Sequence, residues 1–331
     1  MNKQPLVSVI MNCLNCEKYL KEAIDSVYAQ TYSNWEIIFW DNASTDRSAE
    51  IAQSYDDKLR YFRGNETIPL GAARNEAIQQ VQGEFIAFLD CDDLWLPEKL
   101  EKQIPLFADT EVGLVYSDME SFNQKGDRKK VSSQKKYYRG YCFEQLLINY
   151  FLSMPTVIIR KNAVLKQTYA FYNNFQIGEE AELFTRLAYD WKIDYVDEVL
   201  AQWRVHSSSA TWVRYDLLAS ENKVMLDLLN EHIPEFNKQF KNAIRQKKAW
   251  IDKVSVIELW MKGAGKEARS LILKSSHKNI TLIAIYFLSF FSARFMLPLI
   301  FRIKGSAVYT VVLQRLLVEL SNHQASCIKN H

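Results

Sequence analysis

The chain has 331 residues, of which 48% are hydrophobic, and this is enough for one large domain with a substantial core and a smaller appendage. Lys and Arg number 41 against 39 Asp and Glu, so the net charge of +2 gives no electrostatic reason to expect a nucleic-acid partner. The same composition excludes an intrinsically disordered protein.

The cysteines and the N-terminus indicate the compartment. Five cysteines form an odd and scattered set: Cys13, Cys16, Cys91, Cys142 and Cys327. The first residues, MNKQPLVSVIMN, lack the long apolar segment of a signal peptide, so we expect a protein of the reducing cytoplasm. Cys13 and Cys16 match C-x-x-C, a spacing found in redox sites and in half of a zinc site. Because no second C-x-x-C or H-x-H follows, we interpret them as free thiols.

Apolar runs of strand length alternate with helical patterns along the first part of the chain. We expect buried, parallel strands at residues 6–11, 35–40, 59–62, 84–89 and 112–117. Helical spacing over residues 19–27 predicts a helix that Asn15 caps, and residues 71–84 predict a second helix that Gly83 closes. The repeated order of strand, helix and strand indicates an α/β domain with right-handed crossovers.

Two polar clusters follow predicted strands, DNASTD at 41–46 and DCDD at 90–93. In open sheets of this kind, ligands bind outside the carboxyl ends of the strands. DNASTD also suits a turn followed by a helix N-cap, and one loop can serve both purposes.

Three carboxylates, Asp90, Asp92 and Asp93, are concentrated within four positions behind a buried strand. Like charges held this close cost free energy unless a cation or a proton intervenes. Carboxylate oxygens suit a hard divalent cation, so the pattern indicates a site for Mn²⁺ or Mg²⁺. By itself a D-x-D is a weak signal, because acidic turns are common and mostly solvated. Asp93 suits either a cap for a helix beginning near Pro97 or a support for this loop.

The rest of the chain is less informative about chemistry. Residues 125–139 carry seven Lys or Arg, which indicates a solvated hairpin or a loop that attracts a phosphorylated acceptor. Beyond residue 212 the pattern becomes helical and shows no chemical motif. We therefore expect three parts: a catalytic domain at 1–212, a helical extension at 213–278 and an apolar, basic segment at 279–331.

The segment 280–301 is close to the length of about 20 apolar residues that spans a bilayer. Arg294 and Pro298 interrupt it, so a helix pair lying on an anionic membrane surface fits better than a spanning helix. A buried core helix or a dimer interface is the alternative. On the first interpretation the protein is peripheral at the inner face of the cell membrane.

Three ordered blocks of sequence resemble the inverting family 2 glycosyltransferases of bacterial surface-polysaccharide type. The first block is VSVIMNCLNCEKYLKEAIDSVYAQTYSNWEIIFWDNASTDRS, and the second is GAARNEAIQQVQGEFIAFLDCDDLWLPEKL. The third is IGEEAELFTRLA, followed by QWRVHSSSAT. The blocks cover roughly residues 6–212. The resemblance implies a GT-A fold, which is a Rossmann-like, mostly parallel mixed sheet flanked by helices, here with a C-terminal helical extension.

The resemblance also implies roles for individual residues. Seven residues would surround the nucleotide: Asn12, Cys13, Leu14, Asn15, Asp41, Asn42 and Arg74. Asp90 and Asp92 would form the D-x-D pair, with Asp92 as a metal ligand and Asp90 between metal and ribose. Cys91, between them, would be a small residue of the donor-binding loop that faces away.

The resemblance implies that the third block is the acidic catalytic segment of the family. Glu180 would be the general base, with Glu179 as its neighbour. Arg204 would hold the diphosphate, and His206 would complete the metal shell. Without the resemblance, the same residues suit a solvated helix start at Glu179, Glu180 and Glu182, a surface ion pair at Arg204 and a structural histidine at His206.

The sequence departs from the family pattern at two nucleotide-binding positions. Asn42 stands where the family usually has a second Asp that reads uracil, and Leu14 stands where an aromatic residue is common. An amide offers a donor as well as an acceptor, so the preference for a uridine nucleotide is open.

The function that we expect is transfer of a sugar from a nucleotide-diphosphate sugar to a saccharide or polyprenyl-linked saccharide, by a metal-dependent, inverting and non-processive enzyme. A nucleotidyltransferase is the first alternative, but no Gly-rich phosphate loop follows the first strand. A membrane-associated binding scaffold with a degenerate site is the second. The donor sugar, the linkage and the oligomeric state do not follow from the sequence.

Overall fold

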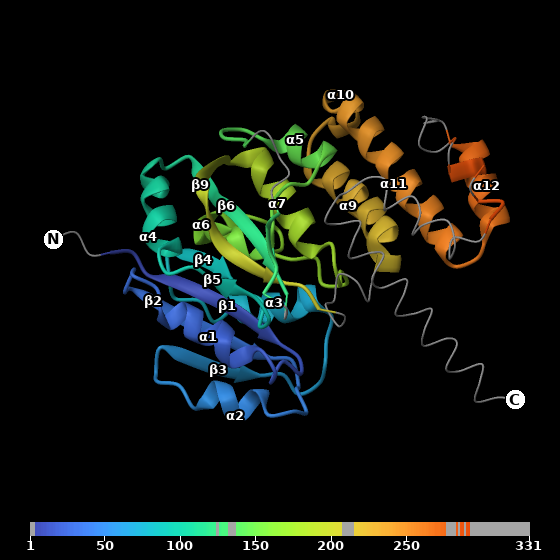
Figure 1. Ribbon diagram of the computed structural model, residues 1–331. Helices are drawn as coiled ribbons and strands as arrows, with labels where there is room; N and C mark the ends of the chain where they lie inside the picture. Colours follow the sequence, from blue (N-terminus) through green and yellow to red (C-terminus); the bar gives the residue numbers. More distant parts are fainter. Residues whose placement is uncertain are drawn as a thin grey trace, which may run out of the picture. The chain divides into compact units, whose positions relative to one another are not determined.

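A computed structural model describes residues 4–123, 126–131, 137–206, 215–275, 283, 285–287 and 289–291 (Figure 1). The chain divides into two compact units, Met1–Val205 and His206–His331. The expected domain boundaries at residues 212 and 278 stay a prediction. Each unit is described by itself below.

The first unit is built on one sheet of nine strands. The strands are β1 (Val7–Cys13), β2 (Trp35–Asp41), β3 (Leu59–Arg63), β4 (Phe85–Phe88), β5 (Leu94–Trp95), β6 (Val112–Phe122), β7 (Arg128–Lys130), β8 (Ile158–Arg160) and β9 (Lys192–Arg204). The helices are α1 (Leu20–Tyr28), α2 (Ser48–Gln53), α3 (Leu70–Ile78), α4 (Lys99–Gln103), α5 (Phe143–Ile148), α6 (Lys161–Leu165) and α7 (Glu179–Asp190), with short 3-10 helices at Ile104–Ala108 and Met154–Thr156.

The strand order is β3-β2-β1-β4-β8-β6-β9-β5, and β7 pairs with β6. The first four strands along this order run parallel. Their carboxyl ends therefore meet at one edge, where Cys13 is in register with Asp41 and Ile10 with Phe88. The strands predicted at 6–11, 35–40, 59–62 and 84–89 are confirmed in position and direction.

Alternating side chains bury both faces of this sheet. On one face, Val9 and Met11 of β1 belong to the same core cluster as Leu20 and Ile24 of α1. On the other face, Phe88 of β4 makes ring contacts with Phe171 and with Phe184 of α7. The sheet thus has helices on both faces (Figure 1).

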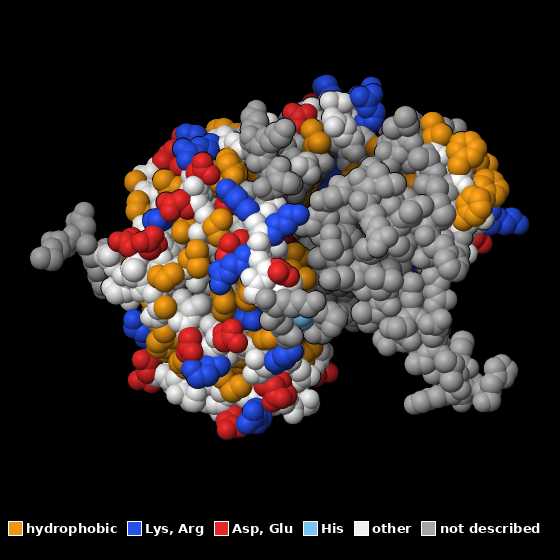
Figure 2. Space-filling view, viewed as in Figure 1, with side chains coloured by type: hydrophobic (Ala, Val, Ile, Leu, Met, Phe, Trp, Pro, Cys, Tyr) orange, Lys and Arg blue, Asp and Glu red, His pale blue; other side chains and the backbone are white. Residues whose placement is uncertain are grey.

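The fifth predicted strand, at 112–117, is part of the longer strand β6, and not all of its neighbours are parallel to it as expected. It pairs antiparallel with β8 and β7 and parallel with β9. Within the described part of the basic segment, the three residues of β7 are exposed, and the strand forms a hairpin with β6. Figure 2 shows Lys and Arg side chains gathered near the middle of the face in view.

Two expected helix ends are wrong. Helix α1 begins at Leu20, with Tyr19 at the N-cap position. Asn15 lies earlier in the loop, with a φ of 56°, and its side chain accepts a hydrogen bond from the loop after β2. Helix α3 ends at Ile78, so Gly83 does not close it. Gly83 is instead packed against β1, so closely that a Cβ there would lie 2.7 Å from the Ser8 backbone nitrogen.

The second unit is helical in its described part, as the sequence predicts. It contains a 3-10 turn at Tyr215–Leu217 and the helices α9 (Leu218–His232), α10 (Phe236–Gln239), α11 (Lys241–Met261) and α12 (Gly265–Lys274). Trp260 of α11 packs with Ala268 and Ile272 of α12 in a small core. Among the helices that the structure describes, none has the length and apolar character needed to cross a bilayer. Most of the apolar segment 280–301 lies outside the described residues.

Candidate active site

The carboxyl edge of the parallel strands gathers the residues that the sequence predicts for a site. Strand β1 ends at Cys13 and β2 at Asp41, while the D-x-D loop (Asp90–Asp93) follows β4 on the other side of β1. Parallel pairing brings these three strand ends together although they are far apart in sequence.

The D-x-D loop separates its three acids by burial. The side chain of Asp90 is 42% exposed, whereas the residue Asp93 is only 2% exposed. Asp93 Oδ1 accepts a hydrogen bond of 2.9 Å from the backbone N–H of Arg204. Burial first, and then the charges of Asp92 and Asp90, raise the pKa of Asp93 well above its usual range. Asp93 therefore supports the loop, and helix α4 begins later, at Lys99.

Arg74 of α3 connects the D-x-D loop to the acidic segment of α7. Its Nη2 lies 3.0 Å from Asp90 Oδ1, and its Nη1 pairs with Glu179 Oε1. The side chains of Arg74 and Glu179 are almost fully buried, at 4% and 3% exposed. Burial alone would lower the pKa of Arg74, but the charges of Glu179 and Asp90 outweigh it and raise that pKa. The guanidinium thus stays charged between two carboxylates.

Glu180, the predicted base, lies next to this ion pair at the start of α7. Tyr150 donates a hydrogen bond of 3.3 Å from its Oη to Glu180 Oε1. Burial, and then the neighbouring charge of Glu179, raise the pKa of Glu180 to about 8. The Glu180 carboxylate is therefore a stronger base than an ordinary carboxylate, and this form becomes populated as the pH rises through about 8.

The interpretation of these acids as a solvated helix start is wrong for two of them. Glu179 is 2% exposed, and Glu182 is fully buried. Glu182 is also held by Arg186, whose Nε lies 2.7 Å from Glu182 Oε1. The helix therefore turns these two carboxylates into the protein.

Arg204 contacts the backbone of the D-x-D loop in addition to forming an ion pair, and its side chain is only 7% exposed. Its Nε donates to the Asp92 carbonyl oxygen at 2.8 Å, and its Nη2 lies 2.8 Å from Glu22 Oε2. The guanidinium carbon also lies 4.4 Å from the ring centroid of Tyr19 and 4.5 Å from that of Phe122. These contacts fix the backbone of the metal-binding candidate Asp92; the predicted contact with a diphosphate stays a prediction.

The carboxyl end of β1 and the loop after it present groups that suit a ligand. The amide oxygen and nitrogen of Asn12 are both buried, with no hydrogen-bond partner among the residues that the structure describes. Leu14 is 44% exposed although it is apolar. A buried polar group without a partner is costly, so Asn12 is suited to a ligand that supplies both a donor and an acceptor.

Asp41 and Asn42 are held in the scaffold behind this loop. Asp41 is fully buried, and its Oδ2 accepts from Tyr61 Oη and from Arg63 Nη1, both at 2.6 Å. Asn42 donates to the Ile68 carbonyl at 2.8 Å and accepts from the Ile68 N–H at 3.2 Å. Both side chains therefore fix the loops around the nucleotide position, and their predicted contacts with base and ribose stay predictions.

The donor set at the D-x-D loop fits a hard divalent cation, because Asp90 and Asp92 offer carboxylate oxygens and neither is fully buried. His206 belongs to the second unit, so its role as a metal ligand stays a prediction.

Sequence reasoning missed four residues of this region, Tyr150, Glu22, Tyr61 and Arg63. Tyr61 and Arg63 alternate on β3 at spacing two, which places them on the same face of that strand beside Asp41. Tyr150 and Glu22 carry no local pattern that marks them, because only the three-dimensional fold brings them to Glu180 and Arg204.

Comparisons with known proteins identify the family of the chain. The family model described as glycosyl transferase family 2 matches residues 8–169. An uncharacterized glycosyltransferase of Methanocaldococcus jannaschii is 30% identical over 213 residues, which are 61% of this chain and 71% of that protein. Escherichia coli WfgD, a UDP-Glc:α-D-GlcNAc-diphosphoundecaprenol β-1,3-glucosyltransferase, is 26% identical over 68% of this chain and 87% of that protein. The chain spans about a third of the length of a Rickettsia felis relative, at 31% identity and 36% of that protein.

Two solved structures resemble the fold. The mannosyltransferase PcManGT of Pyrobaculum calidifontis, solved with GDP-Man and Mn²⁺, has a TM-score of 0.59 at 17% identity and covers 96% of this chain and 88% of that chain. Staphylococcus aureus TarS 1-349, solved with UDP-GlcNAc, has a TM-score of 0.53 at 21% identity and covers 86% of this chain and 90% of that chain. This likeness shows the expected fold, a mixed α/β sheet flanked by helices.

Proposed function

The chain belongs to glycosyltransferase family 2 and has a GT-A fold, and from that premise we propose that it is a metal-dependent, inverting transferase. The donor is a nucleotide-diphosphate sugar, which binds at the carboxyl edge of β1, β2 and β4. The acceptor is a saccharide hydroxyl, carried on a saccharide or on a polyprenyl-linked saccharide.

The observation that carries the proposal is the buried link through Arg74. Asp90 and Glu179 are separated by 89 positions in the sequence, yet both contact the same guanidinium. The link places Glu180, whose pKa is raised to about 8, beside the acids that suit the donor's cation. Sugar transfer needs a base and a site that stabilises the charge of the leaving group, whereas a degenerate scaffold needs neither.

In the proposed reaction, the Glu180 carboxylate accepts the proton of the acceptor hydroxyl. The acceptor oxygen forms a bond to the anomeric carbon while the bond to the diphosphate breaks, and the electron pair leaves with the nucleoside diphosphate. A single displacement of this kind inverts the anomeric centre. Tyr150 holds the Glu180 carboxylate through its hydrogen bond, so that the base faces one direction.

The leaving diphosphate gains negative charge, so the site needs a positive partner there. Asp92 and Asp90 would hold a divalent cation, Mn²⁺ or Mg²⁺, which when bound would neutralise that charge. Arg204 keeps the backbone of Asp92 in place, and Arg74 keeps Asp90 in place.

The proposed acceptor is lipid-linked, and the C-terminal segment 279–331 is proposed to hold the enzyme at the inner face of the cell membrane. Support comes from the Escherichia coli relative, whose name specifies a diphosphoundecaprenol-linked acceptor. Further support comes from aromatic side chains in this segment that are more than 60% exposed: Phe287, Phe290 and Phe291. Lys266 and Arg269 precede them on α12 and would suit an anionic surface.

The experiment is a nucleoside-diphosphate release assay with UDP-, GDP- and dTDP-sugars, with Mn²⁺ and without it. We expect release with one nucleotide class, only when the cation is present. Glu180→Gln is the matched variant: it should still bind the donor in a thermal-shift assay but not transfer. Release at the wild-type rate by Glu180→Gln would move the base elsewhere, and absence of release with all three nucleotides would contradict the proposal.

A further inference from the structure

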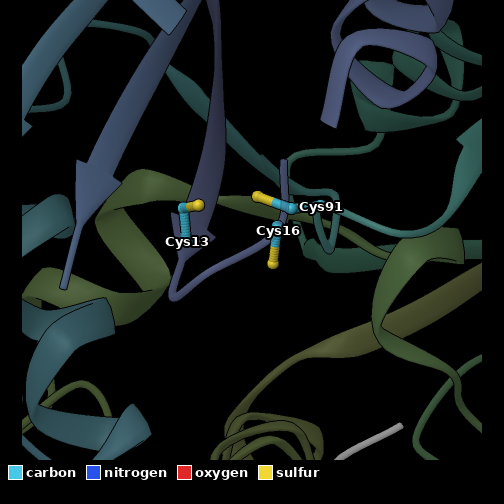
Figure 3. A group of neighbouring side chains, drawn as sticks. All are labelled: Cys13, Cys16 and Cys91. Atoms are coloured by element: carbon cyan, nitrogen blue, oxygen red, sulfur yellow. The ribbon is translucent and has the colours of Figure 1, made fainter. Parts of the chain in front are cut away.

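Three thiols gather between the two loops of the donor site. The Sγ atoms of Cys13, Cys16 and Cys91 all lie within 4.8 Å of one another. Cys13 and Cys91 are 1% and 2% exposed, and Cys16 is half-buried. Figure 3 shows the side chains of Cys13 and Cys91 pointing toward one another, with Cys16 beside them. None of the three thiol groups takes part in the bond changes of the proposed transfer; the family resemblance implies only that Cys13 lies beside the nucleotide and that Cys91 is a small residue of the donor-binding loop.

The topology explains why these residues meet. Cys13 ends β1, and Cys16 follows it in the loop, so the two share the C-x-x-C spacing. Cys91 comes from the loop after β4, which is the parallel neighbour of β1. The Sγ of Cys91 lies 3.3 Å from the Asn12 carbonyl oxygen, which keeps it against the end of β1. The cluster is therefore made by the fold and not by the C-x-x-C pair alone.

We propose that Cys13, Cys16 and Cys91 form a binding site for a thiophilic divalent cation of the Zn²⁺ class. Metal–sulfur bonds of about 2.3 Å in a tetrahedral site place sulfur atoms about 3.8 Å apart. The observed separations of at most 4.8 Å require each pair to close by about 1 Å or less. Cys16, the least buried of the three, supplies this freedom and leaves the fourth position open to water.

This site differs in chemistry from the D-x-D site, although Cys91 stands between Asp90 and Asp92. Thiolates are soft ligands that select Zn²⁺ and related cations, whereas carboxylates suit Mg²⁺ and Mn²⁺. On binding, each thiol that is still protonated loses its proton to solvent as its metal–sulfur bond forms. The bound cation joins the loop after β1 to the D-x-D loop, so its occupancy stiffens the two loops that would hold the donor.

The test is a titration of the reduced, metal-free full-length chain with Co²⁺, which reports thiolate ligation by a sulfur-to-cobalt charge-transfer band. We expect the band to saturate at a single Co²⁺ per chain and to disappear when Zn²⁺ displaces Co²⁺. Zn²⁺ should also raise Tm, because a ligand that binds only the folded state stabilises it. This binding does not depend on transferase activity, so it can succeed or fail independently of the proposed function.

Variants identify the ligands. Cys16→Ser and Cys91→Ser should lose the band and the Zn²⁺-dependent rise in Tm, whereas Cys142→Ser, a buried thiol outside the cluster, should keep both. Asp92→Asn should keep the band, because it removes only a carboxylate. Circular dichroism of Cys16→Ser in EDTA checks that this half-buried position tolerates the change. A wild-type chain without the band, a band that survives Cys16→Ser, or a band lost in Asp92→Asn would overturn the proposal.

Discussion

Arg74 Nη2 lies 3.0 Å from Asp90 Oδ1, and the same guanidinium reaches Glu179 on α7. The buried guanidinium of Arg74 therefore fixes the positions of the D-x-D loop, helix α3 and helix α7 relative to one another. Removing water from such a pair is costly, and the cost is recovered only while both partners are present. The pair is better explained as a positioning device than as a source of stability.

Because of this arrangement, replacing only one partner of the ion pair should strongly reduce stability. Arg74→Met leaves Glu179 buried without its cation, and the free energy of unfolding should fall by about 3–5 kcal/mol. Arg74→Met combined with Glu179→Leu should lose less than the sum of the single variants, since no unpaired charge remains. Denaturant unfolding of the three variants measures this coupling, and additive losses would contradict it.

An exposed pair in the same unit provides the control. Lys21 Nζ lies 2.6 Å from Asp25 Oδ2, with side chains 73% and 49% exposed. Exposed pairs of this kind contribute at most about 1 kcal/mol. Lys21→Met should therefore shift the unfolding midpoint far less than Arg74→Met.

The sequence predicted much of the fold, because β1 to β4 are continuous apolar runs with polar clusters at their carboxyl ends. The helix-cap roles that it predicted for Asn15 and Gly83 are wrong, because both residues instead contact other elements of the fold. The antiparallel neighbours of β6 were missed for the same reason, since direction depends on the pairing partner and not on the strand's own pattern.

Site prediction had the same limit. Sequence motifs located the acids Asp90, Asp92 and Glu180, but only their burial and their contacts in the structure distinguish their roles. Glu179 and Glu182 look alike in sequence, yet one binds Arg74 and the other binds Arg186. The grouping of Cys91 with Cys13 and Cys16 depends on the pairing of β4 with β1, which local sequence does not state.

The pH dependence of transfer should report Glu180. Burial and the Glu179 charge raise its pKa to about 8, and only the carboxylate form accepts a proton. Below that pH, kcat/KM should therefore rise about tenfold per pH unit, and it should level off above about pH 8. Tyr150→Phe removes a hydrogen bond that favours the carboxylate, so the midpoint should move to higher pH. The control is Tyr28→Phe, because the Tyr28 hydroxyl contacts Asp56 and not Glu180; this variant should leave the midpoint unchanged. A rate that stays constant from pH 6 to pH 9, about one unit or more to each side of the midpoint, would argue against Glu180 as the base.

Asp92→Asn should abolish cation-dependent turnover without loss of the folded structure. The amide keeps the shape of the side chain but removes the charge that a hard cation requires. Release of nucleoside diphosphate against Mn²⁺ concentration, with unfolding followed in parallel, measures both effects. Asp57→Asn, an exposed acid in the loop before β3, is the matched control. Normal Mn²⁺ stimulation of the Asp92 variant would remove this residue from the metal site.

Asn42→Asp tests whether this residue holds the loop or reads the base. An aspartate cannot donate to the Ile68 carbonyl, so two acceptors would face each other, and the free energy of unfolding should fall by about 1–3 kcal/mol. Asn34→Asp, where the amide donates to the Gln4 carbonyl at an exposed position, should lose less. We expect the ratio of the Kd values for UDP and GDP, measured by calorimetry, to stay constant. A stable variant with a new preference for UDP would instead assign Asn42 to base recognition.

Membrane association should depend on the exposed aromatic side chains of the second unit. Figure 2 shows hydrophobic side chains near α12, and Phe287 and Phe291 are 63% and 62% exposed. Burial of two such rings in the interface of a bilayer should contribute a few kcal/mol, roughly, to the free energy of membrane binding. Replacing both by Ser in the full-length chain should therefore weaken binding to anionic vesicles at least about tenfold. Leu165→Ser, at a position 61% exposed in the first unit, is the matched control. Flotation with vesicles measures the fraction of protein that is bound. Deletion of residues 279–331 should abolish vesicle binding. A deletion variant that floats as well as the full chain would assign membrane binding to another surface.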